Sequence, residues 1–163
     1  MHIVVWIMGV TGSGKTTLGE ALARETGWIF FDGDDFHPSS NIKKMSKGIS
    51  LNDSDRLPWL ETIHSLVKLQ LQKSSVIIAC SALRESYRQL LMAGIENRSF
   101  WILLNGDMNI IKERMDNRIG HYMPSVLLPS QISQLEKPEY GMEVDINFPM
   151  EEIVRRIKNK LYE

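Results

Sequence analysis

Short apolar runs alternate with amphipathic segments along most of this chain. A continuous run of about four to eight apolar, largely β-branched or aromatic residues predicts a strand, and Ile3–Met8 is an example. Such runs are typical of strands that are buried on both faces of a parallel sheet. The predicted strands are Ile3–Met8, Trp28–Phe31, Ser75–Cys80, Ser99–Leu104 and a weaker one at Glu143–Ile146.

Between these runs, apolar residues recur three or four positions apart, which indicates helices with one face turned to a core. The longest such series is Leu57, Leu60, Ile63, Val67 and Leu71. We expect Ser54 or Asp55 to cap that helix, Asp107 to cap a later one, and Gly27 to end the first. The predicted helices run from the Gly-rich loop to Gly27, over Ser39–Lys47, from Ser54 or Asp55 to Leu71, over Ser86–Ala93, from Asp107 to Met115 and from Pro149 to Leu161.

Alternating strands and helices predict parallel strand pairing with right-handed crossovers. The fold class is therefore α/β, a doubly wound parallel sheet of about five strands with helices on both faces. A length of 163 residues suits one domain, 1–163. Residues 118–142 contain Pro124, Pro129 and Pro138 and read as loop-rich. We expect segment 118–138 to be a lid that closes over the ligands.

Charge and cysteine content exclude several classes of protein. Lys plus Arg number 19 against 20 Asp plus Glu, a net charge of −1, which argues against a protein that coats nucleic acid or an anionic membrane. The one cysteine, Cys80, excludes an internal disulfide and suits a reducing cytosol. No apolar run approaches the roughly 20 residues that span a bilayer, and no secretory signal pattern is present. We therefore expect a cytoplasmic protein.

The sharpest motif follows the first predicted strand and precedes the first predicted helix. The sequence GVTGSGKT fits G-x-x-x-x-G-K-[ST], whose glycines let the backbone fold around a phosphate. Successive N–H groups and the helix N-terminus then point at the anion. We expect Lys15 to reach the β and γ phosphates and the Thr16 hydroxyl to coordinate Mg²⁺. The predicted nucleotide-binding residues are Gly9, Val10, Thr11, Gly12, Ser13, Gly14, Lys15, Thr16 and Thr17.

Acidic residues follow the second predicted strand. Asp32 and Asp34 are two positions apart, so both can face the cleft at the strand's carboxyl end. One carboxylate would then support the metal, and Asp34 would accept or orient the proton of an acceptor hydroxyl. The plain alternative is an Asp-rich turn.

Basic side chains lie at several predicted loops and helix starts. Arg114 and Arg118 are one helical turn apart and repel each other unless an anion lies between them. His37 and His121 stand in polar loops and are candidate ligands for a substrate. An ordinary solvated arginine is the alternative for each cation. The cations expected to converge on one cleft are Lys15, Arg56, Arg84, Arg88, Arg114 and Arg118.

Seven sequence blocks, in order over nearly the whole chain, resemble the gluconokinases of the phosphate-loop kinase superfamily. Many families share the first block, whereas the DGDDFHP, DRLPWL, CSAL and GHYMP segments are far more specific. The blocks are GVTGSGKTTLG (Gly9–Gly19), DGDDFHP (Asp32–Pro38), NIKKMSKG (Asn41–Gly48), LNDSDRLPWL (Leu51–Leu60), ACSALRESYR (Ala79–Arg88), RIGHYMP (Arg118–Pro124) and LLPSQISQLE (Leu127–Glu136).

The resemblance implies ATP-dependent phosphorylation of D-gluconate at its 6-hydroxyl, giving 6-phospho-D-gluconate. It also implies Mg²⁺, a mobile lid, commonly a homodimer, and the fold of shikimate and nucleoside-monophosphate kinases. Lys15, Asp34 and Arg118 would be catalytic, with Arg118 reaching the transferring phosphoryl group, and Thr16 and Asp32 would support the metal. The sugar-acid pocket would be lined by Asp34, His37, Arg56, Arg84, Arg88 and His121.

Other functions remain open at this point. The same fold could phosphorylate shikimate, another aldonate or a nucleotide. A regulator could bind ATP and signal without any small acceptor, although such a protein does not need the histidine, arginine and aspartate loops described above. No N-K-x-D motif is present, which argues against a GTPase.

Overall fold

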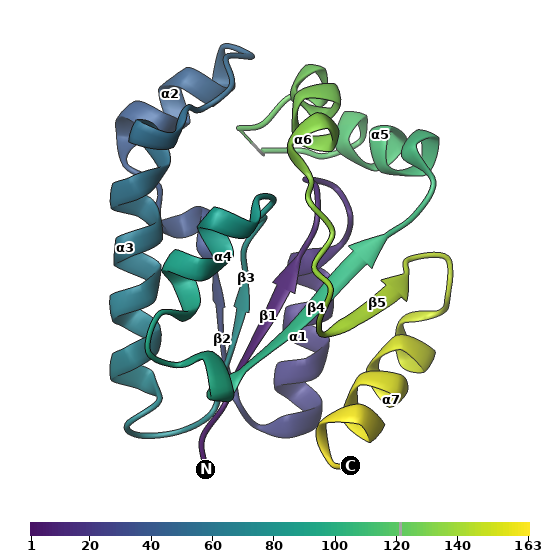
Figure 1. The fold of residues 1–163 in the computed structure, drawn as a ribbon. Coiled ribbons are helices and arrows are strands. Elements are labelled where there is room, and N and C mark those ends of the chain that lie inside the picture. Colours follow the sequence, from purple (N-terminus) through teal and green to yellow (C-terminus); the bar gives the residue numbers. More distant parts are fainter. Residues whose placement is uncertain (121) are drawn as a thin grey trace.

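A computed structural model describes residues 1–120 and 122–163 (Figure 1). Five parallel strands form one sheet in the order β2-β3-β1-β4-β5, which confirms the predicted fold class. The strands are β1 (Val4–Met8), β2 (Ile29–Asp32), β3 (Val76–Ala79), β4 (Ser99–Asn105) and β5 (Met142–Asp145).

Helices connect the strands. The α-helices are α1 (Lys15–Thr26), α2 (Ser39–Ser46), α3 (Asp53–Gln70), α4 (Glu85–Met92), α5 (Met108–Asp116), α6 (Leu128–Gln134) and α7 (Met150–Leu161). Short 3₁₀ turns occur at η1 (Gly33–Phe36), η2 (Glu96–Arg98) and η3 (Ser125–Leu127). None of the helices in the described ranges is long and apolar enough to cross a membrane.

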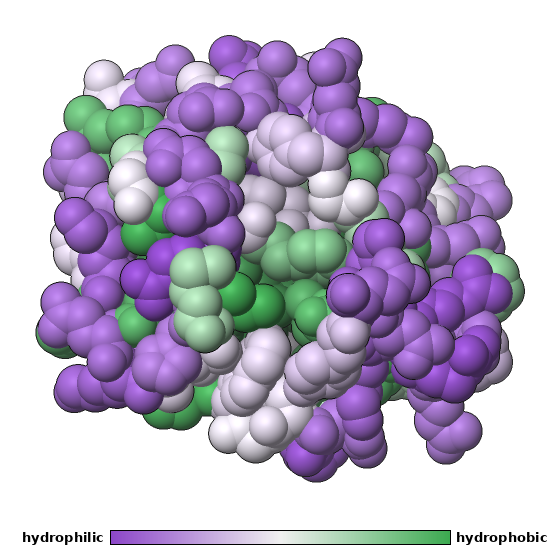
Figure 2. Space-filling model, turned by 60° about the horizontal axis from the view of Figure 1, so that its bottom comes forward, coloured by the Kyte–Doolittle hydropathy of each residue, from purple (hydrophilic) through white to green (hydrophobic). Residues whose placement is uncertain are grey.

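Helices cover both faces of the sheet (Figure 1). The side chains of each strand point alternately to the two faces, so each face carries apolar side chains that pack against helices. In β1, Trp6 and Met8 join a core with α3 and α4, whereas Val5 and Ile7 join a second core with α1, α5 and α7. Trp6 stacks on Trp101 of β4 with ring centroids 5.0 Å apart. Figure 2 shows that the outside is largely hydrophilic in that view, with hydrophobic side chains gathered in a central hollow.

Two local predictions were wrong. Helix α3 is capped by Asn52, not by Ser54 or Asp55, because Asn52 accepts from the Asp55 backbone N–H while the Asp55 carboxylate accepts from Asn52. The loop-rich segment contains α6, which begins at Leu128 with a proline in its first turn. Proline is tolerated there because the N–H that it lacks would have no partner within the helix.

Parallel pairing brings the ends of β1, β2 and β3 to one edge of the sheet. At that edge the Gly9 N–H donates to the Ser81 carbonyl at 3.4 Å. Gly33 directly follows β2 and lies against β3. A Cβ atom at this position would lie 2.5 Å from the Ala79 carbonyl oxygen. Only glycine fits, and the chain turns there into η1. Helix α2 lies on one side of this edge and α5 and α6 on the other (Figure 1).

Candidate active site

The phosphate loop joins β1 to α1 and leaves anion-binding groups available. Gly12 and Gly14 have φ values of 78° and 100°, which favour glycine, and Gly14 caps α1 without a side chain. The Ser13 hydroxyl is buried and has no hydrogen-bond partner among the residues that the structure describes. An unpaired buried polar atom beside a helix N-terminus fits an anionic ligand.

Lys15 lies half-buried in this loop. Its Nζ atom donates to the carbonyls of Gly9 and Val10 at 3.0 and 2.9 Å. Burial lowers the pKa of Lys15 below its ordinary value, and the Asp34 and Asp32 carboxylates oppose the shift. The described hydrogen bonds of this cation thus go to neutral carbonyls, and two carboxylates lie near it.

Thr16, at the start of α1, and Asp32, at the end of β2, bring a hydroxyl and a carboxylate together. The Thr16 hydroxyl donates to Asp32 Oδ2 at 2.6 Å, and Asp32 Oδ1 accepts from the Asp34 N–H at 3.0 Å. Hydroxyl and carboxylate oxygens suit Mg²⁺, which usually takes one or two carboxylates, phosphate oxygens and water. Within the described residues no cluster of three or more His, Cys, Asp or Glu side chains could hold a metal by itself. The residues present thus fit an Mg²⁺ ion that arrives with phosphate.

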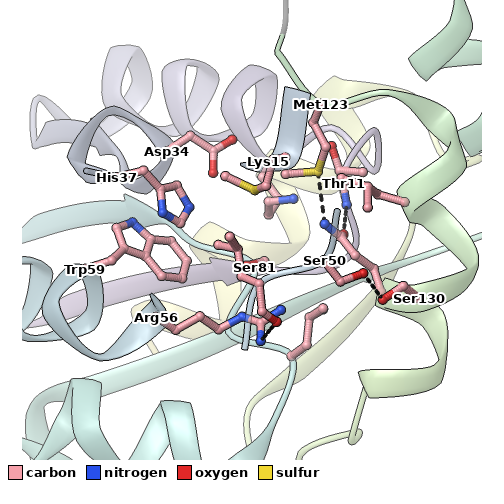
Figure 3. A pocket seen from close by; sticks show the side chains of 15 residues that line it. Thr11, Lys15, Asp34, His37, Ser50, Arg56, Trp59, Ser81, Met123 and Ser130 are labelled. Carbon is pink, nitrogen blue, oxygen red and sulfur yellow. Dashed lines mark hydrogen bonds between the residues drawn. The ribbon is translucent and has the colours of Figure 1, made fainter. Parts of the chain in front are cut away.

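A first pocket opens beside the loop (Figure 3). Asp34, His37, Trp59 and Arg56 line one side of it, and Lys15 projects from the loop between that side and the other. The opposite side comes from the α2–α3 connection and the expected lid. Its lining there includes Ser50, Leu51, Met123, Leu127, Ser130 and Gln131.

His37 is neutral in this pocket. Its ring stacks on Trp59 with centroids 4.0 Å apart, and the Asn41 amide nitrogen lies 3.3 Å from its Nδ1. Burial lowers the pKa of His37 to about 4. The Trp59 indole N–H donates to the Gly33 carbonyl at 2.7 Å, which fixes the stack against η1.

Arg56 is half-buried and lines the first pocket. Its Nη1 atom donates to the Leu51 carbonyl at 2.6 Å and to the Tyr87 hydroxyl at 3.1 Å, and its guanidinium lies over the Tyr87 ring. Across the described chain, all hydrogen-bond acceptors of Arg56 are neutral oxygens and no carboxylate forms an ion pair with it.

Two arginines expected in the substrate pocket do not line it. Arg84 is exposed at the N-cap of α4. Arg88 is fully buried, and it donates to the carbonyls of Ala82, Leu83 and Glu136 at 2.7, 3.1 and 2.7 Å. Ala82 has a φ of 43°, a strained value for a residue with a Cβ atom. Arg88 therefore holds the loop that carries Ala82 and Leu83, and its expected role in substrate binding stays a prediction.

A second pocket lies on the other side of the phosphate loop. Arg114 and Arg118 both line it, and Arg118 Nη1 also donates to the Thr11 hydroxyl at 3.3 Å. The expected ligand His121 lies outside the described residues. The remaining lining is mostly apolar or from the loop, and consists of Gly12, Ser13, Gly14, Thr17, Leu18, Leu104, Ile146, Phe148, Met150 and Ile153.

Sequence reasoning missed several residues that line these pockets. Ile146 and Phe148 follow the last strand, so their place at a strand's carboxyl end is the signal that could have found them. Trp59 and Gln131 stood in blocks that carried the family resemblance, but no role was given to them. Nothing in the local sequence separates Arg56, which reaches the pocket, from Arg84, which does not.

Known proteins match nearly the whole chain. The family model for shikimate kinase matches residues 11–140. A thermosensitive gluconokinase of Escherichia coli is 41% identical over 93% of this chain and 83% of its own length. The structure of a gluconokinase from Sinorhizobium meliloti superposes with a TM-score of 0.82 and 41% identity, over 99% of this chain and 95% of that one. A sugar kinase from Janibacter superposes with a TM-score of 0.90 and 38% identity over the same shares.

The neutral state of His37 predicts a pH dependence of stability. Because the pKa of His37 is about 4 in the folded protein, against about 6.5 when exposed, the unfolded chain takes up a proton first as the pH falls. The stability that the neutral His37 ring contributes to the folded protein is fully present above pH 6.5 and is lost as the pH falls toward 4. Urea unfolding should show about 2 kcal/mol less stability at pH 5 than at pH 7 from this group. The variant His37→Phe keeps a ring on Trp59 but has no group to titrate, so this difference in stability between pH 7 and pH 5 should be absent. An equal loss of stability in the variant would contradict the assignment of the effect to His37.

The buried guanidinium predicts a large effect on stability. Replacing Arg88 by Met removes its hydrogen bonds to three carbonyls, two of them buried, and its 2.7 Å ion pair with Glu85, so the unfolding free energy should fall by about 3 kcal/mol. The matched control Arg84→Met, four residues earlier and exposed, should change it by less than about 0.5 kcal/mol. Urea unfolding followed by circular dichroism measures both, and equal effects would refute the structural role of Arg88.

Proposed function

The chain belongs to the gluconokinase family, within the phosphate-loop kinases described by the shikimate kinase model, and we propose that it transfers the terminal phosphoryl group of ATP to the 6-hydroxyl of D-gluconate. One observation supports this acceptor above others. The first pocket joins Lys15 and Asp34 at one end to Arg56 at the other, and Arg56 has no carboxylate partner in the described chain. A polyol with one terminal carboxylate matches both ends.

Arg56 supplies the site for the carboxylate. Its described partners are a carbonyl, a hydroxyl and an amide oxygen, so its positive charge is not neutralised in advance. A guanidinium binds a carboxylate through two parallel hydrogen bonds, which fixes the direction of the bound acid as well as its position. The neutral His37 and the Trp59 ring form the wall along which the hydroxyl groups would lie.

Asp34 serves the acceptor hydroxyl. In the proposed reaction its carboxylate takes the hydroxyl proton, the hydroxyl oxygen forms a bond to the γ-phosphorus, and the bond from that phosphorus to the ADP oxygen breaks. Positioning and charge neutralisation are the main requirements of such a transfer. Lys15 and Arg118, which both hydrogen-bond to phosphate-loop residues, would supply positive charge to the phosphoryl group.

The nucleotide occupies the second pocket. Phe148, Ile146 and Met150 offer an apolar surface for the base, and Arg114 lies over the phosphate loop. Thr16 and Asp32 would hold Mg²⁺, which neutralises phosphate charge when it is bound. Residues 9–17 would cradle the phosphates.

The remaining parts of the proposal concern the whole chain. Residues 1–163 would act as a single kinase domain, with segment 118–138 as the lid. The segment touches both sides of the site, since Ser130 Oγ lies 2.7 Å from Ser50 Oγ and the Glu136 N–H donates to the Leu83 carbonyl. The family resemblance supports a cytoplasmic homodimer.

An acceptor panel tests the function. Purified protein with Mg-ATP should release ADP in the presence of D-gluconate, and kcat/KM for D-glucitol, which lacks the carboxylate, should be lower by about 100-fold or more. A coupled ADP assay with gluconate, glucitol, shikimate and AMP measures this. Stronger turnover with shikimate or AMP than with gluconate would overturn the proposal, as would ATP binding without turnover on any acceptor.

The role of Asp34 has a matched control in its neighbour. Asp34→Asn should lower kcat by about 10²- to 10⁴-fold, because the amide cannot take the proton, while ATP binding stays unchanged. Asp35→Asn, at an exposed position one residue later, should stay within a few-fold of the wild type. Steady-state kinetics and nucleotide titration decide this. Normal transfer in Asp34→Asn removes its assigned role.

A further inference from the structure

Helix α6 carries two glutamines that contact different parts of the site. The Gln131 amide oxygen accepts from the backbone N–H of Thr11, in the phosphate loop, at 2.7 Å. The Gln134 amide oxygen accepts from Arg56 Nη2 at 2.9 Å, at the end of the first pocket that is proposed to bind the carboxylate. Residues three apart share a helix face, so one short helix reaches both ends of the pocket.

The hydrogen bonds of Arg56 show what Gln134 does there. A guanidinium has five N–H groups, and described residues engage three of them: two on Nη1, through Leu51 and Tyr87, and one on Nη2, through Gln134. The Nε–H and one Nη2–H remain for another acceptor. These belong to adjacent nitrogens, and a carboxylate can bind such a pair with both of its oxygens.

The chemistry of Gln134 suits this task. An amide oxygen orients the guanidinium without neutralising it, whereas a carboxylate at the same place would compete with an acidic ligand. The Gln134 amide is itself oriented, because its Nε2 donates to Ser130 Oγ at 3.3 Å, and that hydroxyl lies 2.7 Å from Ser50 Oγ. Gln134 does not line the pocket, so it acts through Arg56.

We propose that Gln134 is a positioning residue that presents Arg56 to the acceptor's carboxylate, and that Gln131 fixes α6 to the phosphate loop. Helix α6 then sets the separation between the bound carboxylate and the phosphate loop. The inference rests on the proposed function, because it assumes an acidic acceptor in the first pocket.

Kinetics of Gln134→Met test the positioning role. Methionine keeps the side-chain length but removes the acceptor oxygen, so KM for gluconate should rise about tenfold while KM for ATP stays within about twofold. The preference for gluconate over glucitol should fall by a similar factor. The control Ser133→Ala lies on the same helix, and its exposed hydroxyl bonds only to the Ser130 carbonyl among described partners; it should behave like the wild type.

A second variant separates positioning from packing. Gln134→Glu keeps the shape and the oxygen but adds a negative charge beside Arg56. The protein should remain as stable as the wild type, yet KM for gluconate should rise about tenfold, because Arg56 is neutralised. A residue that only fills space would leave the KM of this variant unchanged, and that result would overturn the proposal.

A double-variant cycle tests the tie to the phosphate loop. If Gln131 and Gln134 hold the same helix, the KM increase in Gln131→Met plus Gln134→Met should be smaller than the product of the single effects. A multiplicative result would reject the role of Gln131. Wild-type KM and selectivity in both Gln134 variants would reject that of Gln134. Absence of gluconate turnover in the wild type would instead reject the proposed function.

Discussion

Parallel pairing of β1 with β3, and of β3 with β2, is the constraint on which the site depends. It places three strand ends at one edge, so that the loop after β1 lies against the carboxylates after β2 and the connection after β3. The 2.6 Å hydrogen bond from Thr16 to Asp32 joins the first turn of α1 to this edge. Gly33 is required because the Ala79 carbonyl leaves no room for a side chain. The cleft is therefore a product of strand register.

The treatment of charge at this edge follows one rule. Lys15 and Arg56 are held by carbonyl, hydroxyl and amide oxygens, which fix their positions without cancelling their charges. Arg88 bonds to carbonyls too, but it is fully buried and serves the loop that carries Ala82. Arg56 thus lines a pocket, whereas Arg88 supports a loop, and the two arginines differ in their exposure.

Predictability from sequence followed the range of the interactions. The phosphate loop and the acidic run after β2 were readable because each is local and stands at a strand end. Helix α6 was not, because three prolines suggested a loop, and Pro129 in fact lies in the first turn of a helix. The different positions of Arg84 and Arg88 could not be predicted from the sequence either. They are one helical turn apart, and only the packing of α4 decides which of them is buried.

The phosphate loop lies between the first and the second pocket. Thr11 and Lys15 face the first pocket, whereas Gly12, Ser13 and Gly14 face the second, so the loop is the wall between two sites. Arg118 contacts residues of both pockets, because it lines the second pocket and donates to the hydroxyl of Thr11, which lines the first. The Thr11 N–H in turn donates to the Gln131 amide oxygen. Thr11 therefore contacts both Arg118 and Gln131, and α6 is hydrogen-bonded to the phosphate loop and to Arg56 at once.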